Sequence, residues 1–170
     1  MNRENFVLIG MPGCGKSTVG VVLAKVLGYH FLDSDLAIQA REGKKLHEII
    51  EEKGQEGFRQ VENEVNASLN CHRTVIATGG SVIYGAEAME HLRSIGTVIY
   101  LKLSHGEIAH RLGDLHKRGV TLKEGQTLKD LYDERIPLYE KYAHWVLDCE
   151  GLRLRRVVQT ICDKAESQNQ

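Results

Sequence analysis

The amino-acid sequence predicts an α/β protein in which helices cover both faces of a parallel sheet. Three observations lead to this fold class. Five short apolar runs have the length and β-branched content of strands buried on both faces. Segments with helical spacing separate these runs, and glycines or acidic residues follow the first three. A length of 170 residues suits one domain, 1–170, with a sizeable core.

The strands are expected at the apolar runs 6–9, 30–33, 75–77, 97–101 and 145–147. The first helix is expected after residue 18, where apolar residues recur with helical spacing up to Gly28. Further helices are expected near 36–38, 46–53, 57–71, 87–94, 104–112, from 127, and 157–165. Gly54 should break the helix at 46–53, and Pro137 must end or kink the helix that begins near 127. The tail from Ala165 is expected to be disordered.

Residues 10–17 match the phosphate-binding loop pattern G-x-x-x-x-G-K-[ST], between a predicted strand and a predicted helix. The glycines let backbone N–H groups point at phosphate oxygens, and the helix N-terminus adds partial positive charge. Lys16 is expected to reach the transferring phosphate, and the Ser17 hydroxyl to bind Mg²⁺. A tight glycine turn that only caps a helix is the alternative, and the flanking elements disfavour it. The predicted nucleotide-binding residues here are Gly13, Cys14, Gly15, Lys16, Ser17 and Thr18.

Two carboxylates follow the second strand, at Asp33 and Asp35. Phosphoryl transfer needs anions that hold Mg²⁺ and a carboxylate that orients the attacking hydroxyl. A helix N-cap is the alternative interpretation, because Asp is well suited to that position. With a phosphate loop in the same sheet, the functional interpretation is favoured, since ligands bind where parallel strands end.

Four further positions suggest ligand contacts, each with a simpler alternative. Arg59 and Glu62 lie at i, i+3, and that spacing alone favours a helix-surface ion pair over a pair that grips an anionic substrate. Gly80 allows backbone close to a ligand, or merely forms a turn. Arg135 lies beside Pro137, which suggests positioning.

The stretch 112–126 lacks an apolar period and contains three glycines among charged residues. Such a segment in a compact domain is either a mobile functional lid or a solvated loop. Arg111 and Arg118 flank or belong to it, and an arginine closing on the phosphates would stabilise charge during transfer.

Bulk composition excludes several classes of function. The formal net charge is −1, so no general bias toward nucleic acid or an acidic membrane exists. No apolar run approaches the roughly 18 residues of a membrane helix. Neither the eight histidines nor the four cysteines show metal-ligand spacing, and the cysteines are expected to be reduced thiols of a cytoplasmic protein.

Taken in order, these motifs resemble the shikimate kinase family across nearly the whole chain. The resemblance rests on the loop at 10–18, the 31–35 segment, F-R-x-x-E at 58–62, T-G-G at 78–80, the two lid arginines, and E-R-x-P-L-Y at 134–139. It implies a three-layer P-loop kinase fold like that of nucleoside monophosphate kinases, with a five-stranded parallel sheet of order 2-3-1-4-5. It also implies a monomer that phosphorylates the 3-hydroxyl of shikimate from ATP, with Mg²⁺, on the route to aromatic amino acids.

The resemblance further implies a role for each site residue. Lys16, Asp35 and Arg118 would be catalytic, with Asp35 holding the shikimate hydroxyls as base or orienter. Ser17 and Asp33 would serve Mg²⁺, and Arg111 would stack near adenine. The substrate-binding residues would be Asp35, Arg59, Gly80 and Arg135, within a segment at about 34–62 and the later helix.

The sequence departs from the family pattern at two places: Ser81 replaces a third glycine, and Gly119 replaces a proline in the lid. Ser81 either narrows the pocket or supplies a hydroxyl, and Gly119 loosens the hinge. These positions leave two alternatives: a kinase of another small hydroxylated acid, such as gluconate or homoserine, and a non-catalytic nucleotide sensor. The two substrate arginines favour a carboxylate acceptor, and retention of Lys16 and Asp35 disfavours the sensor.

Overall fold

The computed structural model describes residues 4–113, 120 and 122–168. Its centre is a five-stranded sheet of order β2-β3-β1-β4-β5, in which every neighbouring pair is parallel. This order confirms the prediction. The strands are β1 (Asn5–Ile9), β2 (His30–Asp33), β3 (Thr74–Ala77), β4 (Gly96–Lys102) and β5 (Trp145–Asp148).

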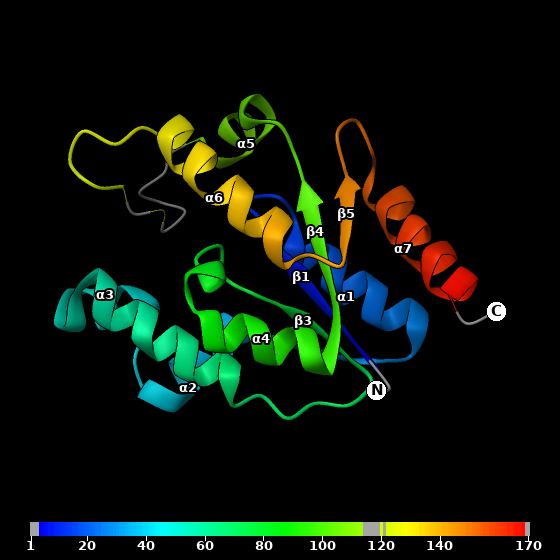
Figure 1. Ribbon diagram of the computed structural model, residues 1–170, viewed down its shortest axis with the longest axis horizontal. Coiled ribbons are helices and arrows are strands. Elements are labelled where there is room, and N and C mark those ends of the chain that lie inside the picture. The colour runs from blue at the N-terminus through cyan, green and yellow to red at the C-terminus, as the bar shows by residue number, and fades with distance from the viewer. Residues whose placement is uncertain (1–3, 114–119, 121, 169–170) are drawn as a thin grey trace.

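Helices cover both faces of this sheet (Figure 1). They are α1 (Lys16–Leu27), α2 (Ser34–Glu42), α3 (Leu46–Ala67), α4 (Ala86–Ile95), α5 (His105–Leu112), α6 (Leu128–Tyr142) and α7 (Leu154–Gln168), with a short 3₁₀ helix η1 (Val82–Tyr84). Within the described part of the chain, no helix has both the length and the apolar character needed to cross a membrane.

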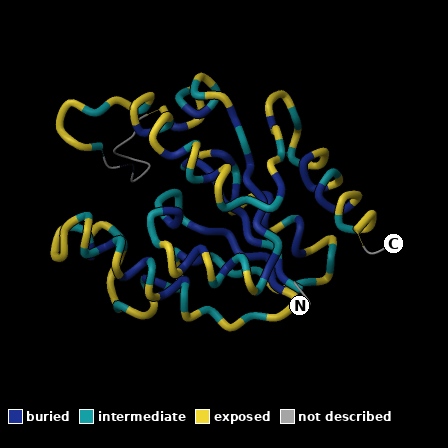
Figure 2. Tube along the Cα trace, viewed as in Figure 1, coloured by how far each residue is buried: buried dark blue, intermediate teal, exposed yellow. Residues whose placement is uncertain are grey.

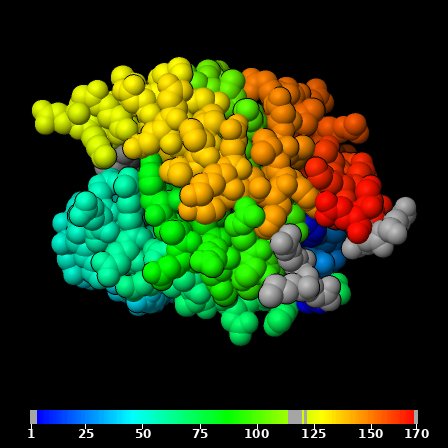
Figure 3. All heavy atoms as spheres, viewed as in Figure 1, coloured from blue at the N-terminus to red at the C-terminus, as the bar shows by residue number. Residues whose placement is uncertain are grey.

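Contacts of β1 and β4 show which helices lie on which face. A Cβ on Gly20 of α1 would lie 3.5 Å from Leu8, so α1 packs on the Leu8 face. Tyr100 stacks on Tyr139 of α6, with ring centroids 5.0 Å apart. Leu8 is paired with Ile99, and successive side chains of a strand alternate between faces. Therefore α1 and α6 cover opposite faces, and α6 and α4 dominate the face seen in Figure 3.

The core follows the central strands, which are the darkest part of Figure 2. Val7, Leu8, Ile9, Val75 and Ile76 are fully buried. Strands buried on both faces must be apolar at successive positions, and this is why the sequence shows runs rather than alternation. The parallel arrangement brings the carboxyl ends of β1, β2 and β3 to one edge of the sheet, where the phosphate-binding loop begins.

Three element boundaries differ from the sequence predictions. Helix α6 continues through Pro137 to Tyr142, because its buried face, which includes Leu131 and Tyr139, outweighs one missing backbone hydrogen bond. Helix α7 reaches Gln168, so the predicted disorder from Ala165 is wrong for residues 165–168. The chain does leave helical geometry at Gly54 (φ 72°, ψ 178°), although α3 resumes and ends at Ala67.

Candidate active site

The phosphate-binding loop connects β1 to α1 at the carboxyl end of the central strand. Gly15 has φ +100°, a left-handed conformation that favours glycine and turns the chain into α1. The Lys16 side chain is buried, and its Nζ donates to the carbonyls of Gly10 (2.7 Å) and Met11 (2.9 Å). The loop thus holds a fixed ammonium group beside the exposed N–H groups of a helix N-terminus, which is an anion-binding arrangement.

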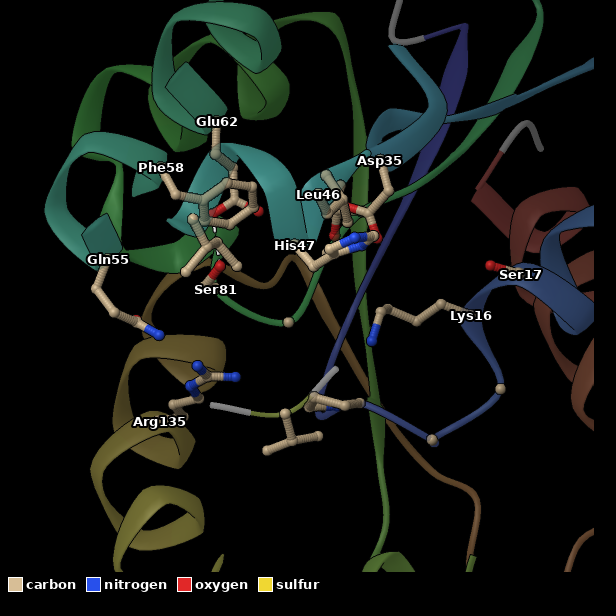
Figure 4. A pocket seen from close by; sticks show the side chains of 18 of the residues that line it. Lys16, Ser17, Asp35, Leu46, His47, Gln55, Phe58, Glu62, Ser81 and Arg135 are labelled. Carbon is tan, nitrogen blue, oxygen red and sulfur yellow. Dashed lines mark hydrogen bonds between the residues drawn. The ribbon is translucent and has the colours of Figure 1, made fainter. Parts of the chain in front are cut away.

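A cavity of about 680 Å³ opens beside this loop. Figure 4 shows Lys16, Asp35 and Arg135 directed toward it from three different elements. Of the sequence-predicted site residues, eight line the cavity: Gly13, Gly15, Lys16, Ser17, Thr18, Asp35, Gly80 and Arg135. The structure therefore brings together residues that are far apart in the sequence, from Gly13 to Arg135.

Ser17 and Asp33 form a pair of oxygen donors at the side of the loop. The Ser17 hydroxyl donates to Asp33 Oδ2 at 3.4 Å. Asp33 Oδ1 also accepts from the backbone N–H of Asp35 (2.9 Å), so Asp33 is the N-cap of α2 as well. The N-cap interpretation of Asp33 is therefore confirmed, and its role toward Mg²⁺ stays a prediction. Mg²⁺ binds through one or two protein oxygens plus substrate phosphates, and this donor set fits it.

Asp35 and Glu62 face the same glycine. A Cβ on Gly79 would lie 2.8 Å from Asp35 Oδ1 and 2.8 Å from Glu62 Oε2. Only glycine leaves room for both carboxyl groups there. Burial, reinforced by the charge of Asp33, raises the pKa of Asp35, while nearby Lys16 lowers it. A carboxylate with a raised pKa is better suited to accept a proton from a hydroxyl.

Ser81 lines the cavity, and its hydroxyl is turned to Glu62. Its Oγ donates to Glu62 Oε1 at 2.6 Å. Glu62 is 2% exposed, and its Oε2 has no hydrogen-bond partner in the part of the chain that the structure describes. Burial raises the pKa of Glu62 to about 7, with the neighbouring Asp35 adding to the shift and the Ser81 hydrogen bond opposing it.

Glu62→Gln is expected to change how stability depends on pH. Because the folded pKa of about 7 exceeds the ordinary 4.5, the unfolded chain loses this proton first, and the wild-type loses stability as pH rises from about 4.5 to 7. Glutamine removes that loss. Urea unfolding should therefore show Glu62→Gln gaining on the order of 3 kcal/mol relative to wild type between pH 5 and pH 8. The exposed Glu90→Gln is the control, and equal pH profiles for Glu62→Gln and wild type would contradict the buried assignment.

Five of the predicted nucleotide-binding residues line a second, smaller hollow beside the loop: Gly13, Cys14, Gly15, Thr18 and Arg111. Cys149 and apolar residues at the start of α7 also line it. Arg111 Nη1 donates to the Cys14 carbonyl (3.4 Å), and its Nε donates to Glu107 (2.8 Å). This hollow, of about 280 Å³, shares Gly13, Gly15 and Thr18 with the main cavity, and neither Asp35 nor Arg135 lines it. Arg118 and Gly119 lie outside the described residues.

The ion pair that the spacing of Arg59 and Glu62 favoured is not formed, and substrate binding by Arg59 stays a prediction. Among the described residues no ion pair joins Arg59 to Glu62, although the two are one helical turn apart, because Glu62 is turned to Ser81. The Arg59 guanidinium instead lies over the ring of Tyr84, with Cζ 3.9 Å from the centroid. It does not line the main cavity, whereas Arg135 does.

Sequence reasoning missed two tyrosines that support the site. Tyr139 is fully buried, and its hydroxyl donates to the Gly80 carbonyl at 2.6 Å, fixing the backbone beside the cavity. Tyr84 contacts both Arg59 and Arg135. Tyr139 falls within the E-R-x-P-L-Y motif, so the motif contained a signal for it. No periodicity or spacing marks Tyr84.

Comparisons with known proteins agree with this geometry. A family model described as shikimate kinase matches residues 12–166. The chain belongs to the shikimate kinase family. It is 40% identical to the shikimate kinase of Methylococcus capsulatus, over 97% of this chain and 94% of that one. It is 37% identical to the shikimate kinase of Thermodesulfovibrio yellowstonii, over 96% and 95%.

A solved shikimate kinase has the same fold. The structure from Acinetobacter baumannii, a complex with shikimate, superposes with a TM-score of 0.88 at 34% identity and covers 98% of this chain and 95% of that one. Membership of the shikimate kinase family makes the chain an enzyme, a phosphotransferase that uses a nucleotide. The P-loop fold and the sheet order expected from the resemblance are both confirmed.

Proposed function

We propose that this enzyme transfers the γ-phosphoryl group of ATP to the 3-hydroxyl of shikimate, giving shikimate 3-phosphate and ADP on the route to chorismate. The observation that carries the proposal is one cavity, lined by Lys16, Asp35 and Arg135, in a chain of this family. The Lys16 ammonium can bind the phosphates of the donor, and the Asp35 carboxylate can bind the attacking hydroxyl. The buried Arg135 guanidinium can bind the carboxylate of an acidic acceptor.

The donor half of the reaction belongs to the loop. Residues 13–18 would surround the β and γ phosphates with backbone N–H groups, and Lys16 would contact the phosphoryl group in transfer. Arg111 would lie beside the adenine, in the hollow that it lines with Cys14. Ser17 and Asp33 would hold Mg²⁺, which when bound would neutralise phosphate charge. The segment 112–126, with Arg118, stays a predicted lid.

The acceptor half belongs to the segment 34–62 and to α6. Asp35 would accept a hydrogen bond from the attacking hydroxyl and orient it, or take its proton, as its raised pKa supports. Arg135, 7% exposed, would bind the carboxylate with Arg59 by charge-assisted hydrogen bonds. The Gly80 backbone would contact the substrate, since its carbonyl is already fixed by Tyr139.

The four free cysteines support a reducing compartment such as the cytoplasm. No nucleic acid or membrane is needed by this proposal, in keeping with a formal net charge of −1.

The test is ADP release in a coupled assay with shikimate, quinate, gluconate, homoserine or no acceptor. Shikimate should give turnover far above the rate without acceptor, and the product should carry phosphate on the 3-hydroxyl by ³¹P and ¹H NMR. Faster turnover of gluconate or homoserine would replace the proposal with a kinase of that acid. Nucleotide binding without turnover of any acceptor would favour the non-catalytic sensor.

A further inference from the structure

Tyr84 connects two arginines from different helices. It ends η1, and its ring lies beneath the Arg59 guanidinium of α3, with Cζ 3.9 Å from the centroid. Arg135 of α6 is on the same ring at 5.5 Å, and its Nε donates to Tyr84 Oη at 3.4 Å. Tyr84 Oη in turn donates to Glu134 Oε2 at 2.9 Å. One aromatic side chain therefore contacts two positive groups, of which Arg135 lines the main cavity.

Neither arginine forms an ion pair with an acid among the described residues. No ion pair within 4.0 Å involves Arg59 or Arg135 there, and Arg59 Nε is buried without a hydrogen-bond partner. The acid best placed in sequence to pair with Arg59 is Glu62, which accepts from Ser81 at 2.6 Å instead. The Glu62 carboxylate is near enough for the charges of Arg135 and Arg59 to lower its pKa, but among the described residues it forms no ion pair with either arginine.

An aromatic face orients a guanidinium in a way that an ion pair does not. Cation–π attraction acts through the face of the planar group, whereas a carboxylate uses its N–H edge. Stacking on Tyr84 therefore leaves the in-plane donors of Arg59 available for a bidentate contact with an incoming anion. An ion pair with Glu62 would use those same donors and would lower the positive charge offered to the ligand.

We propose that Tyr84 is a positioning residue that holds Arg59 and Arg135 ready to bind the carboxylate of the acceptor, in place of an acidic partner. The proposal rests on the proposed function, because it takes the acceptor to be a carboxylic acid. The proposal includes a part for Ser81: because its hydroxyl donates to the Glu62 carboxylate, that carboxylate does not pair with Arg59.

Tyr84→Leu tests this directly. It removes the ring and hydroxyl, and should raise the KM for shikimate by about tenfold, the ratio that a lost partly desolvated cation–π contact gives, with little change in kcat or in the KM for ATP. Tyr84→Phe keeps the ring, so its KM for shikimate should be close to that of the wild type. The methyl ester of shikimate lacks the negative charge, so its KM should be nearly the same in Tyr84→Leu and wild type.

Tyr29→Leu is the matched control. Tyr29 also carries an arginine over its ring, Arg73 at 5.1 Å, but it follows α1 and lies outside the cavity lining. The Tyr29→Leu variant should therefore have the wild-type KM for shikimate. An unchanged KM in Tyr84→Leu would overturn the proposal. Equal increases for the acid and the ester would also overturn it, because they would indicate a general structural defect.

The acceptor panel separates this proposal from the proposed function. If another carboxylic acid is the best acceptor, the proposed function fails, and the Tyr84 comparison is made with that acid and its methyl ester. A tenfold effect confined to the acid would then still support Tyr84 as a positioning residue. If the best acceptor is uncharged, or no acceptor is used, both proposals are overturned.

Discussion

Asp35→Asn is expected to lower kcat for shikimate by about 10²–10⁴-fold, the usual contribution of a general base, with the fold intact. Asparagine preserves the size of the side chain and leaves the backbone bond to Asp33 in place. What it loses is the ability to take a proton and the negative charge facing Lys16. The KM for ATP should change little, since Asp35 lies on the acceptor side of the cavity. Steady-state kinetics measure kcat and the KM for ATP, and a thermal melt shows whether the fold is intact.

The same residue predicts the direction of a pH effect. Since the base must be deprotonated, kcat/KM should fall as pH falls through the pKa of Asp35, and that acid limb should lie above the ordinary value of 3.8. Asp133→Asn is the control, because that aspartate is exposed on α6 and pairs with Lys129. Asp35→Asn that kept more than about a tenth of wild-type kcat would remove it from the base role.

The fold was largely predictable because each strand is buried on both faces. Apolar runs such as 6–9 and 97–101 are the direct consequence of that burial. Strand order was different: it came from the family resemblance, since the pairing of β1 with both β3 and β4 depends on contacts between distant segments. Helix ends were the weakest predictions. Pro137 shows why. The cost of a proline inside a helix is a local effect, but the packing of α6 outweighs it, and that packing cannot be read from the neighbouring sequence.

Site residues were predictable where their position relative to the nearest strand is enough to place them at the site. The loop at 10–17, Asp35 and Gly80 follow strand ends, and parallel strands bring such ends together. The partner of Arg59 was not predictable in this way. Spacing placed Glu62 beside it, but Ser81 reaches Glu62 from the end of β3, and Tyr84 reaches Arg59 from η1. These contacts exist only because α3 packs against η1.

Lys16→Met is expected to abolish measurable turnover, a loss of at least about 10³-fold in kcat. Catalysis of phosphoryl transfer is almost entirely positioning and charge stabilisation, and a fixed cation at the transferring group is among its largest components. The ammonium of Lys16 is already held by the Gly10 and Met11 carbonyls, so it needs little reorganisation when the phosphates bind. Methionine matches the length and apolar stem but carries no charge.

The structure also predicts how this loss divides between binding and chemistry. Backbone N–H groups of the loop remain in Lys16→Met, so ADP should still bind, with its affinity lowered about tenfold, while kcat falls much further. Two carbonyls lose a charged donor, which should lower the free energy of unfolding by about 1–3 kcal/mol. Lys25→Met, exposed on the last turn of α1, is the control for both measurements. If ADP affinity and kcat fell by the same factor, Lys16 would be a ground-state binding residue, and its assignment to the transferring phosphoryl group would be wrong.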